Sequence, residues 1–368
     1  MSRILFANTN FENELSSLDY CSILEGVEKN PLFMQLQFLP FLYADPKDTV
    51  LLTNLPKDSY LEMLSQAIPC DSPRLLCLND DHQRDFSCHK LYSWGYSKQL
   101  SKWAKKHGIS YDTPPWGAIT SVNRKDFAFI HSSQLPGAAL LFCQKEVDQW
   151  LKKPFSKKVF KSCFGVAAKG NLIVDTRQPR SLSRLFPFLQ QQWKRDLPVI
   201  AEPWVERFLD FSTHWYINPK KQFNYLGAAV MKNDSKGMYV QSIVANEEKL
   251  FSRYLWALEE HFDEAKKLLK KIASQGYFGH VGIDAMLYRW PGEEGKLFLQ
   301  AIVEVNARQT MSFIAILHQR LYYSDKCLYL SYSRVKKKGK ELLPKKLQRS
   351  NGSVVTFSRQ LYSRVEEV

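Results

Sequence analysis

Short apolar runs alternate with segments of helical spacing along the first part of the chain. Three apolar runs of strand length occur there: Ile4–Ala7, Val50–Leu52 and Leu75–Leu78. Between the last two runs, Ser59–Ala67 repeats its apolar residues at the spacing typical of a helix with one buried face. Strands that alternate with helices usually form a parallel sheet. The pattern therefore predicts a parallel α/β domain over residues 1–115, which ends where Pro114 and Pro115 force an extended linker.

Beyond the two prolines the pattern is that of longer strands joined by turns. Lys158–Phe164 and Leu172–Asp175 are expected to pair as a hairpin whose tip, Gly165–Gly170, consists mostly of small residues. Further strands are predicted at Pro198–Ala201, Phe211–Ile217, Tyr225–Val230, Val281–Tyr288 and Leu297–Asn306. Glu247–Ala273 carries apolar residues at helical spacing and predicts one long amphipathic helix. We therefore expect an α+β architecture over residues 116–330.

Charge is distributed unevenly along the chain. The formal net charge is +14, and residues 331–368 supply half of it, with ten Lys and Arg against three acids. A basic segment can bind nucleic acid, an anionic membrane or an acidic substrate. No aromatic stacking platform accompanies these lysines, which favours a solvated basic C-terminal extension and leaves a nucleic acid or acidic partner as the alternative.

Composition indicates a soluble globular protein. Hydrophobic residues make up 45% and charged residues 24% of the chain, and no apolar run is long enough to cross a bilayer. The N-terminus does not read as a signal peptide. Seven scattered cysteines without a CxxC pair indicate a reducing, cytoplasmic location. The patch Asp80-Asp81-His82…Cys88-His89 contains metal-ligand residue types, but its spacing favours a polar surface loop over a zinc site.

The last two predicted strands carry acidic residues on one face. If the hairpin turns about Glu294, Asp284 lies opposite Glu304, and Asn306 shares the face of Glu304 because it lies two residues further along the strand. Acids without a partner are costly on a surface rich in Ile, Val and Leu. A hard cation such as Mg²⁺, which prefers oxygen ligands, would remove that cost. A solvent-facing sheet with polar residues is an equally strong interpretation of this hairpin alone.

Two other segments have the composition of a nucleotide site. Lys161 precedes the small-residue loop that contains Gly165 and Gly170, where backbone N–H groups could approach phosphate oxygens closely. Neither a GxxxxGK[ST] nor a GxGxxG motif occurs, and the loop taken singly favours an ordinary hairpin. Further on, Glu202-Pro203-Trp204-Val205 follows an apolar strand and leads to Asp210. The backbone at the end of that strand could bind adenine, and the carboxylate that follows it could bind the ribose. A simple connecting turn is the alternative for that segment.

In this order the segments resemble the ATP-grasp superfamily. The matching stretches are KSCFGVAAKG (161–170), EPWV (202–205), GID (282–284) and EVNAR (304–308). The N-terminal region fits as well, because Gly95-Tyr96-Ser97-Lys98 begins a predicted helix that stops at Gly108 and is followed by Pro114. The resemblance covers about residues 95–320, and the acidic pair is its most specific part. Alanines in the glycine loop, and Asp210 where relatives have Glu, depart from the pattern of the family.

The resemblance implies an ATP-grasp fold, with an N-terminal α/β pre-ATP-grasp domain followed by two lobes that hold ATP between them and a hinge near residues 202–206. Lys161 and Lys98 would contact the phosphates, and Gly165–Gly170 would form a flap over them. Glu202 and the backbone of Trp204 and Val205 would hold adenine, and Asp210 would hold the ribose.

The resemblance also implies the metal site and the reaction. Asp284, Glu304 and Asn306 would bind two Mg²⁺ ions, with Mn²⁺ as a substitute, and Arg308 would bind the transferred phosphoryl group or the substrate carboxylate. The expected enzyme is a carboxylate-amine ligase that acts on small molecules, forms an acyl phosphate and releases ADP and phosphate, with a homodimer as one possible assembly. A phosphotransferase of the same superfamily and a non-catalytic nucleotide- or nucleic-acid-binding protein are the alternatives.

Overall fold

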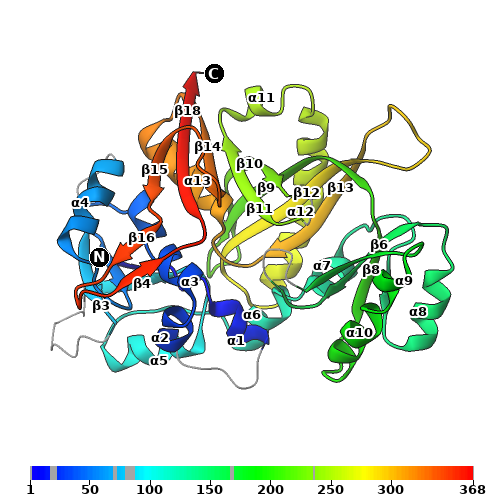
Figure 1. Cartoon of the computed structure of the whole chain (residues 1–368), viewed down its shortest axis with the longest axis horizontal. Helices are drawn as coiled ribbons and strands as arrows, with labels where there is room; N and C mark the ends of the chain where they lie inside the picture. The colour runs from blue at the N-terminus through cyan, green and yellow to red at the C-terminus, as the bar shows by residue number, and fades with distance from the viewer. Residues whose placement is uncertain are drawn as a thin grey trace.

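The structure is a computed structural model that describes residues 2–16, 23–68, 73–78, 88–165, 170–234 and 237–367. Three sequence features lie outside these ranges: most of the Asp80-Asp81-His82 patch, residues 166–169 of the glycine loop, and the cysteines Cys21 and Cys70. A body that holds both termini is joined to a smaller lobe, at the right in Figure 1. No helix in the described ranges combines the length and the apolar character needed to cross a membrane.

The N-terminal unit is a parallel sheet in the order β3-β2-β1-β4, as the alternating pattern predicted. Its strands are β1 (Ser2–Phe6), β2 (Thr49–Leu52), β3 (Arg74–Cys77) and β4 (His89–Ser93). The helical segments around it are α1 (Phe11–Ser16), α2 (Ile23–Glu28), α3 (Pro31–Leu36), the 3-10 helix Leu39–Leu42, α4 (Asp58–Ala67) and α5 (Lys98–Lys106). The Ser97 hydroxyl caps α5 by accepting a hydrogen bond from the N–H of Leu100, and Gly108 with φ +66° follows its end.

The small lobe is an antiparallel sheet in the order β5-β8-β6-β7, reached through α6 (Trp116–Val122) and α7 (Lys125–His131). Its strands are β5 (Ala139–Leu141), β6 (Lys157–Ser162), β7 (Asn171–Asp175) and β8 (Val199–Pro203). Helices α8 (Gln144–Leu151), α9 (Pro179–Leu182) and α10 (Leu185–Trp193) accompany it, and its core is a cluster of its own around Phe160 and Trp150. The predicted hairpin 158–175 is β6 with β7.

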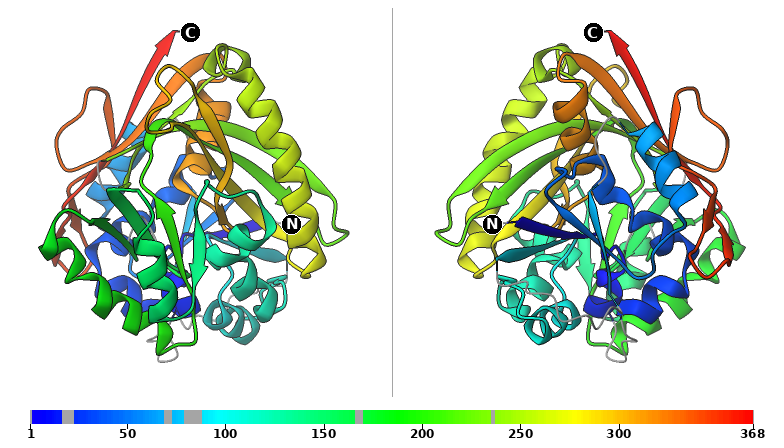
Figure 2. Two further views of the ribbon diagram at one scale, coloured as in Figure 1. Left: turned by 90° about the vertical axis from the view of Figure 1, so that its right-hand side faces the viewer. Right: turned by 90° about the vertical axis from the view of Figure 1, so that its left-hand side faces the viewer.

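The large sheet has the order β13-β12-β9-β10-β11-β14-β18-β15. Its first strands are β9 (Glu206–Ile217), β10 (Phe223–Asn233), β11 (Tyr239–Val244), β12 (Gly279–Arg289) and β13 (Phe298–Asn306). Helices α12 (Leu255–Ser274) and α13 (Met311–Tyr322) cover opposite faces (Figure 2). This follows from β9, where Thr213 bonds His261 of α12 while the next residue, His214, packs on Phe313 of α13.

The long helix predicted over Glu247–Ala273 is divided in two. α11 (Glu247–Leu250) ends before a turn, and α12 begins at Leu255. Phe251 in this turn is fully buried and packs edge-on against Phe211 of β9. The turn between the two helices thus places this ring in the core beside β9.

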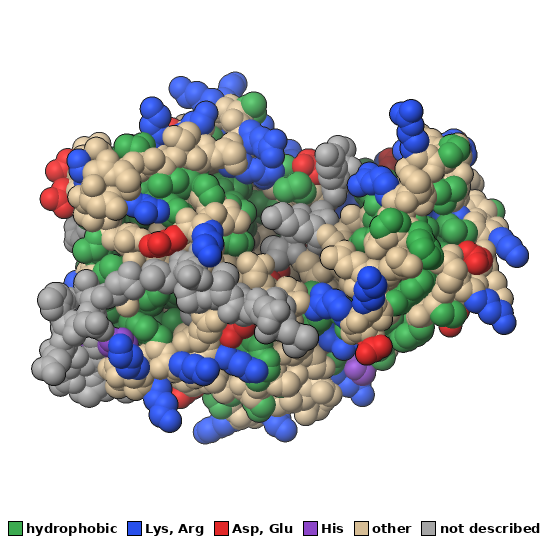
Figure 3. Space-filling view, turned by 60° about the horizontal axis from the view of Figure 1, so that its bottom comes forward, with side chains coloured by type: hydrophobic (Ala, Val, Ile, Leu, Met, Phe, Trp, Pro, Cys, Tyr) green, Lys and Arg blue, Asp and Glu red, His purple; other side chains and the backbone are tan. Residues whose placement is uncertain are grey.

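The basic segment 331–368 differs from the solvated extension that its charge suggested. The expected boundary at 330 falls inside β14 (Lys326–Ser333), and β18 (Gln360–Glu367) pairs with β14 along its whole length. The remaining strands of the segment are β15 (Lys340–Leu343), β16 (Lys346–Gln348) and β17 (Val354–Thr356). Apolar residues such as Leu343 and Leu361 are fully buried, while the exposed lysines gather in the loop 334–340. On the face in Figure 3, basic side chains are spread over both the body and the small lobe.

The N-terminal unit and the large sheet share one hydrophobic core. The same cluster of buried side chains includes Phe38 and Trp94 from the former, Ile283 and Val305 from the latter, and Phe313 from α13. The chain passes from the small sheet to the large one between Pro203 and Glu206, where the hinge was expected. The acid-bearing strands β12 and β13 therefore lie on a packed body, which the chain leaves through α6 and α7 and re-enters after β8.

Candidate active site

Asp284 and Glu304 are directly opposite each other in neighbouring strands. The register of β12 and β13 pairs Asp284 with Glu304 and Gly282 with Asn306, which confirms the pairing predicted from the hairpin. The Asn306 side-chain amide donates a hydrogen bond of 3.2 Å to Asp284 Oδ2. Burial, and next the negative charge of Glu304, raise the pKa of the Asp284 carboxyl to about 7. Two carboxylates and an amide thus converge where the ionised form of one acid is disfavoured.

Lys125 is a cation beside this acid pair that the sequence patterns did not indicate. Its ammonium group lies 3.5 Å from Glu304 Oε1, and its side chain is only 8% exposed, against 29% for that of Glu304. Lys125 is the first residue of α7, and its backbone N–H donates to the carbonyl of Cys163 at 2.9 Å. The start of α7 therefore links the end of β6 to the acidic strand. Periodicity gave no sign of this helix, so the residue could not be found from the sequence.

Lys161 and Glu202 form an ion pair across the small sheet. Their Nζ and Oε2 atoms are 2.6 Å apart, and both side chains are largely buried. The sequence motifs assigned them separate partners, phosphate for Lys161 and adenine for Glu202. Next to the pair, the Trp204 N–H donates to the carbonyl of Lys157 at 3.0 Å, and Val205 is buried. The structure therefore brings these two candidate residues together at the connection between the lobes.

Asp210 is held by its neighbours on the large sheet. Arg207 donates from Nε to Oδ1 at 2.8 Å, and the Asn233 side chain donates to Oδ2 at 2.9 Å. Asp210 shares its face of β9 with Ser212, which is in register with Asp284. The proposed ribose residue thus lies on the same side of the sheet as the acid pair, and its carboxylate is fixed in orientation.

Arg308, immediately beyond β13, contacts Glu12 in the N-terminal unit. The Arg308 Nε donates to Glu12 Oε1, and both side chains are mostly buried, with 11% and 14% exposed. Glu12 belongs to α1 and was not identified from the sequence, because no motif surrounds it. This contact joins the N-terminal unit to the acidic strands.

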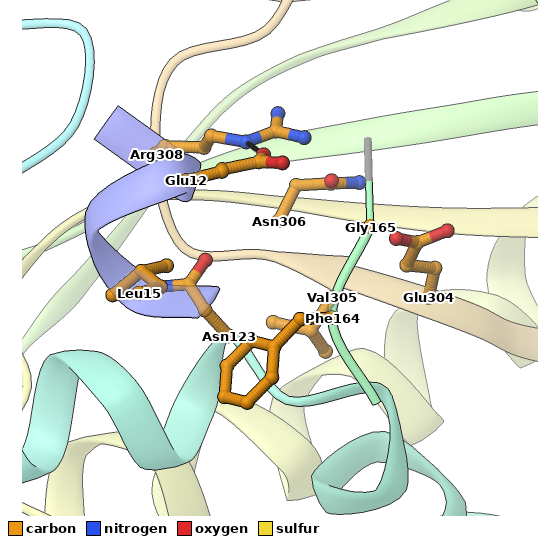
Figure 4. Close-up of a pocket in the computed structure, with 9 residues that line it drawn as sticks. All are labelled: Glu12, Leu15, Asn123, Phe164, Gly165, Glu304, Val305, Asn306 and Arg308. Carbon is orange, nitrogen blue, oxygen red and sulfur yellow. Dashed lines mark hydrogen bonds and ion pairs between the residues drawn. The ribbon is translucent and has the colours of Figure 1, made fainter. Parts of the chain in front are cut away.

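A small pocket open to solvent is lined by Glu304 and Asn306 of β13 together with Arg308 and Glu12. Figure 4 shows Arg308 and Glu12 side by side, with Asn306 close to them and Phe164-Gly165 passing in front of the strand that carries Glu304. Gly170, at the other end of the loop, has φ +90°, and a Cβ there would lie 2.3 Å from the Ser162 hydroxyl, so this position requires glycine. Gly165 thus lines the pocket, and Gly170 lies against the end of β6.

Lys98, the first residue of α5, contacts an aromatic ring. Its ammonium group lies over the Trp116 ring at the start of α6, 4.8 Å from the centroid.

The donor set fits a magnesium ion. Asp284 and Glu304 supply carboxylate oxygens and Asn306 an amide oxygen, which are hard ligands. A cation between the two carboxylates would also offset the repulsion that raises the pKa of Asp284. Among the described residues no group of three or more His, Cys, Asp and Glu could hold a metal by itself.

Solved structures resemble this one over most of its length. Phosphoribosylamine–glycine ligase from Thermotoga maritima has a TM-score of 0.55 and 14% identity, over 100% of this chain and 92% of its own. A second similar structure is the biotin carboxylase domain dimer of 2-oxoglutarate carboxylase from Hydrogenobacter thermophilus, in complex with MgADP, ADP and bicarbonate. It has a TM-score of 0.52 and 12% identity, over 99% of this chain and 85% of its own. Biotin carboxylase from Campylobacter jejuni, in a β-γ-ATP complex, has a TM-score of 0.51 and 11% identity, over 94% of this chain and 78% of its own.

At such identities the likeness establishes the fold. The chain has the ATP-grasp fold, as the order of its motifs predicted. No family model matches the sequence, and no curated protein matches it either.

Proposed function

We propose that this protein is an ATP- and Mg²⁺-dependent ligase that activates a carboxylate as an acyl phosphate and couples it to an amine, releasing ADP and phosphate. The observation that carries the proposal is the register of Asp284 with Glu304, beside Asn306 and next to a pocket that Arg308 also lines. The ATP-grasp fold and the nucleotide complexes of the similar biotin carboxylase structures support it.

In this proposal Asp284, Glu304 and Asn306 hold two Mg²⁺ ions, which Mn²⁺ can replace. Bound Mg²⁺ would neutralise the charge of the triphosphate and polarise its oxygens. Carboxylates are poor electrophiles, and moving the γ-phosphoryl group onto one depends on positioning and charge neutralisation. The residues of this chain that would supply those two effects are Lys161 and Arg308, of which Arg308 lines the pocket and would orient the substrate carboxylate.

The nucleotide would lie between the two lobes. Lys161, oriented by its ion pair with Glu202, would bind phosphate oxygens, and Lys98 would do so only after leaving the Trp116 ring. The backbone of Trp204 and Val205 would bind adenine, and Asp210 would bind the ribose. The segment Gly165–Gly170 would cover the phosphates and exclude water, because an acyl phosphate hydrolyses when water reaches it.

The test combines a binding measurement with a product analysis. ATP affinity is measured calorimetrically with and without Mg²⁺, and we expect measurable binding only with the metal, since acidic residues alone repel a triphosphate. Equal affinity in both conditions would remove the metal site. A screen of small acids and amines for release of ADP and phosphate then tests the reaction, and AMP as the main product would favour a phosphotransferase.

A further inference from the structure

Arg195, just beyond the end of α10, reaches from the small lobe to the N-terminal unit. Its guanidinium donates a hydrogen bond from Nη2 to the carbonyl of Ser16, the last residue of α1. The same guanidinium lies over the Phe164 ring, with its central carbon 5.9 Å from the ring centroid. One exposed side chain therefore contacts both α1 and the segment that follows β6.

These two contacts lie beside the pocket. Leu15 of α1 lines the pocket, together with Phe164 and Gly165 from the segment after β6 (Figure 4). Helix α1 also provides Glu12, whose carboxylate accepts a hydrogen bond from Arg308 Nε. An arginine of the body and an arginine of the small lobe thus both contact α1, which forms a wall of the pocket between them.

The backbone at the end of α10 fixes where the Arg195 side chain begins. The next residue, Asp196, has φ +52°, in the left-handed region where the chain turns away from the helix. Its N–H donates to the carbonyl of Trp193 at 3.0 Å, and Leu197 after it is buried. The Trp193 indole N–H donates to the carbonyl of Leu141 in β5 at 3.4 Å, so this corner is tied to the small sheet.

The charge of α1 favours a cation at its end. The helix carries Glu12 and Glu14 and has no lysine or arginine, and the last carbonyls of a helix have no partner within it. Arg195 itself is exposed, so breaking its bond to Ser16 leaves no buried charge without a partner. The contact is therefore suited to form when the small lobe closes and to break when it opens.

We propose that Arg195 is a positioning residue that holds the small lobe closed against α1, with Phe164 and Gly165 at the pocket; this rests on the proposed function, which places the nucleotide between the lobes. Release of that nucleotide requires the small lobe to move away from the body. The movement separates Phe164 from Leu15 and breaks the bond between Arg195 and Ser16. Arg195 thus slows nucleotide release through the position of the lobe.

Two measurements test this role. Small-angle X-ray scattering of the nucleotide-free protein reports whether the lobe stays closed. Stopped-flow release of a fluorescent ADP analogue from its Mg²⁺ complex, displaced by excess ATP, reports how long the lobe retains the nucleotide. We expect Arg195→Gln to increase the radius of gyration and to speed release about tenfold, as for loss of one hydrogen bond from a charged donor. Lys194→Gln, the same loss of charge on the exposed residue before it, should change neither.

The outcomes separate this inference from the proposed function. Release at the wild-type rate by a folded Arg195→Gln protein would overturn the inference, and so would unchanged scattering. Faster release that Lys194→Gln reproduces would do the same, because the charge near the end of α10 rather than the contact with α1 would then be responsible. A wild-type protein that binds no ADP analogue would refute the proposed nucleotide site, while scattering would still decide whether Arg195 holds the lobe.

Discussion

Lys125 places its ammonium group 3.5 Å from Glu304 Oε1, although the two residues belong to elements that are distant in the sequence. The contact exists because α7 begins at the point where β6 ends and is tied there through the carbonyl of Cys163. Lys125 thus provides a positive charge beside a carboxylate that we assign to the metal. A fixed lysine and a divalent cation near one carboxylate repel each other.

Lys125→Met should therefore tighten metal binding by the nucleotide-free protein. The substitution removes the charge and leaves an unbranched side chain that is one atom shorter. We expect Mn²⁺ affinity, measured by the loss of the free-ion electron paramagnetic resonance signal, to rise roughly tenfold, or about 1.4 kcal/mol. Lys267→Met, which removes a lysine paired with Glu264 on an exposed part of α12, is the control and should not change it. Weaker Mn²⁺ binding in the Lys125 variant would mean that this lysine supports the metal ligands.

Glu304→Gln should abolish turnover while the fold survives. The substitution preserves shape, and Glu304 is partly exposed, so the melting temperature should change little. In the proposed two-metal site, loss of the charge that would offset the cations should slow phosphoryl transfer by several powers of ten. Asp284→Asn and Asn306→Ala should be impaired to a lesser degree, because each would contribute fewer metal contacts. Melting temperature and ADP release measured on one preparation decide the matter, since a solvent-facing glutamate would tolerate Gln with normal turnover.

Truncation after Leu330 should prevent folding. The cut removes the last residues of β14 and all of β18, the strand with which β14 pairs, and it exposes Leu328 and Leu330, which are fully buried. We expect an aggregated product or one without a cooperative thermal transition. Replacing Lys336, Lys337 and Lys338 by Gln in the exposed loop should leave the melting temperature and turnover unchanged. Salt-sensitive nucleic-acid binding that disappears in this triple variant would restore a binding role for the loop.

Acid should destabilise the protein through buried histidines. His261 is bonded to Thr213 Oγ1 at 2.7 Å and to the Ala301 carbonyl at 2.6 Å, and burial lowers its pKa to about 4; burial likewise lowers the pKa of His318 to about 4. Because the folded protein favours the neutral rings, these rings contribute to the free energy of unfolding. That contribution is fully present above the unfolded pKa of about 6.5 and is lost as the pH falls towards 4. Each ring can contribute up to about 3 kcal/mol.

Urea unfolding at several pH values between 7.5 and 4 tests this effect. The free energy of unfolding should decrease as the pH falls below 6.5, and the decrease should be shallower by about one bound proton in His261→Gln. His131→Gln, on an exposed residue of α7, is the control. A free energy of unfolding that stays level over this range would show that these rings are not kept neutral by the fold.

The sequence by itself determined the features that depend on local pattern. A turn about Glu294 placed Asp284 opposite Glu304 from chain positions alone, and the strands do pair these residues. Pairs nearer the turn, such as Met286 with Gln300, centre on Glu293, and a register shift between Asp284 and Met286 brings Asp284 opposite Glu304. The parallel N-terminal sheet could also be predicted, because strand-length apolar runs and the helical spacing of apolar residues are each visible in the local sequence. The order of the motifs was enough to identify the ATP-grasp fold.

Tertiary structure alone decided which charges meet. Lys125 with Glu304, Lys161 with Glu202 and Arg308 with Glu12 come from elements whose approach depends on how sheets and helices pack, and no local period encodes that approach. The basic C-terminal segment shows the same limit. Its lysines made it look like a solvated tail, but its alternating apolar residues, such as Leu361, are buried once β18 pairs with β14. The composition of the segment shows its charged residues, which lie on the exposed face. Burial of its apolar residues depends on pairing with a strand that is distant in the sequence.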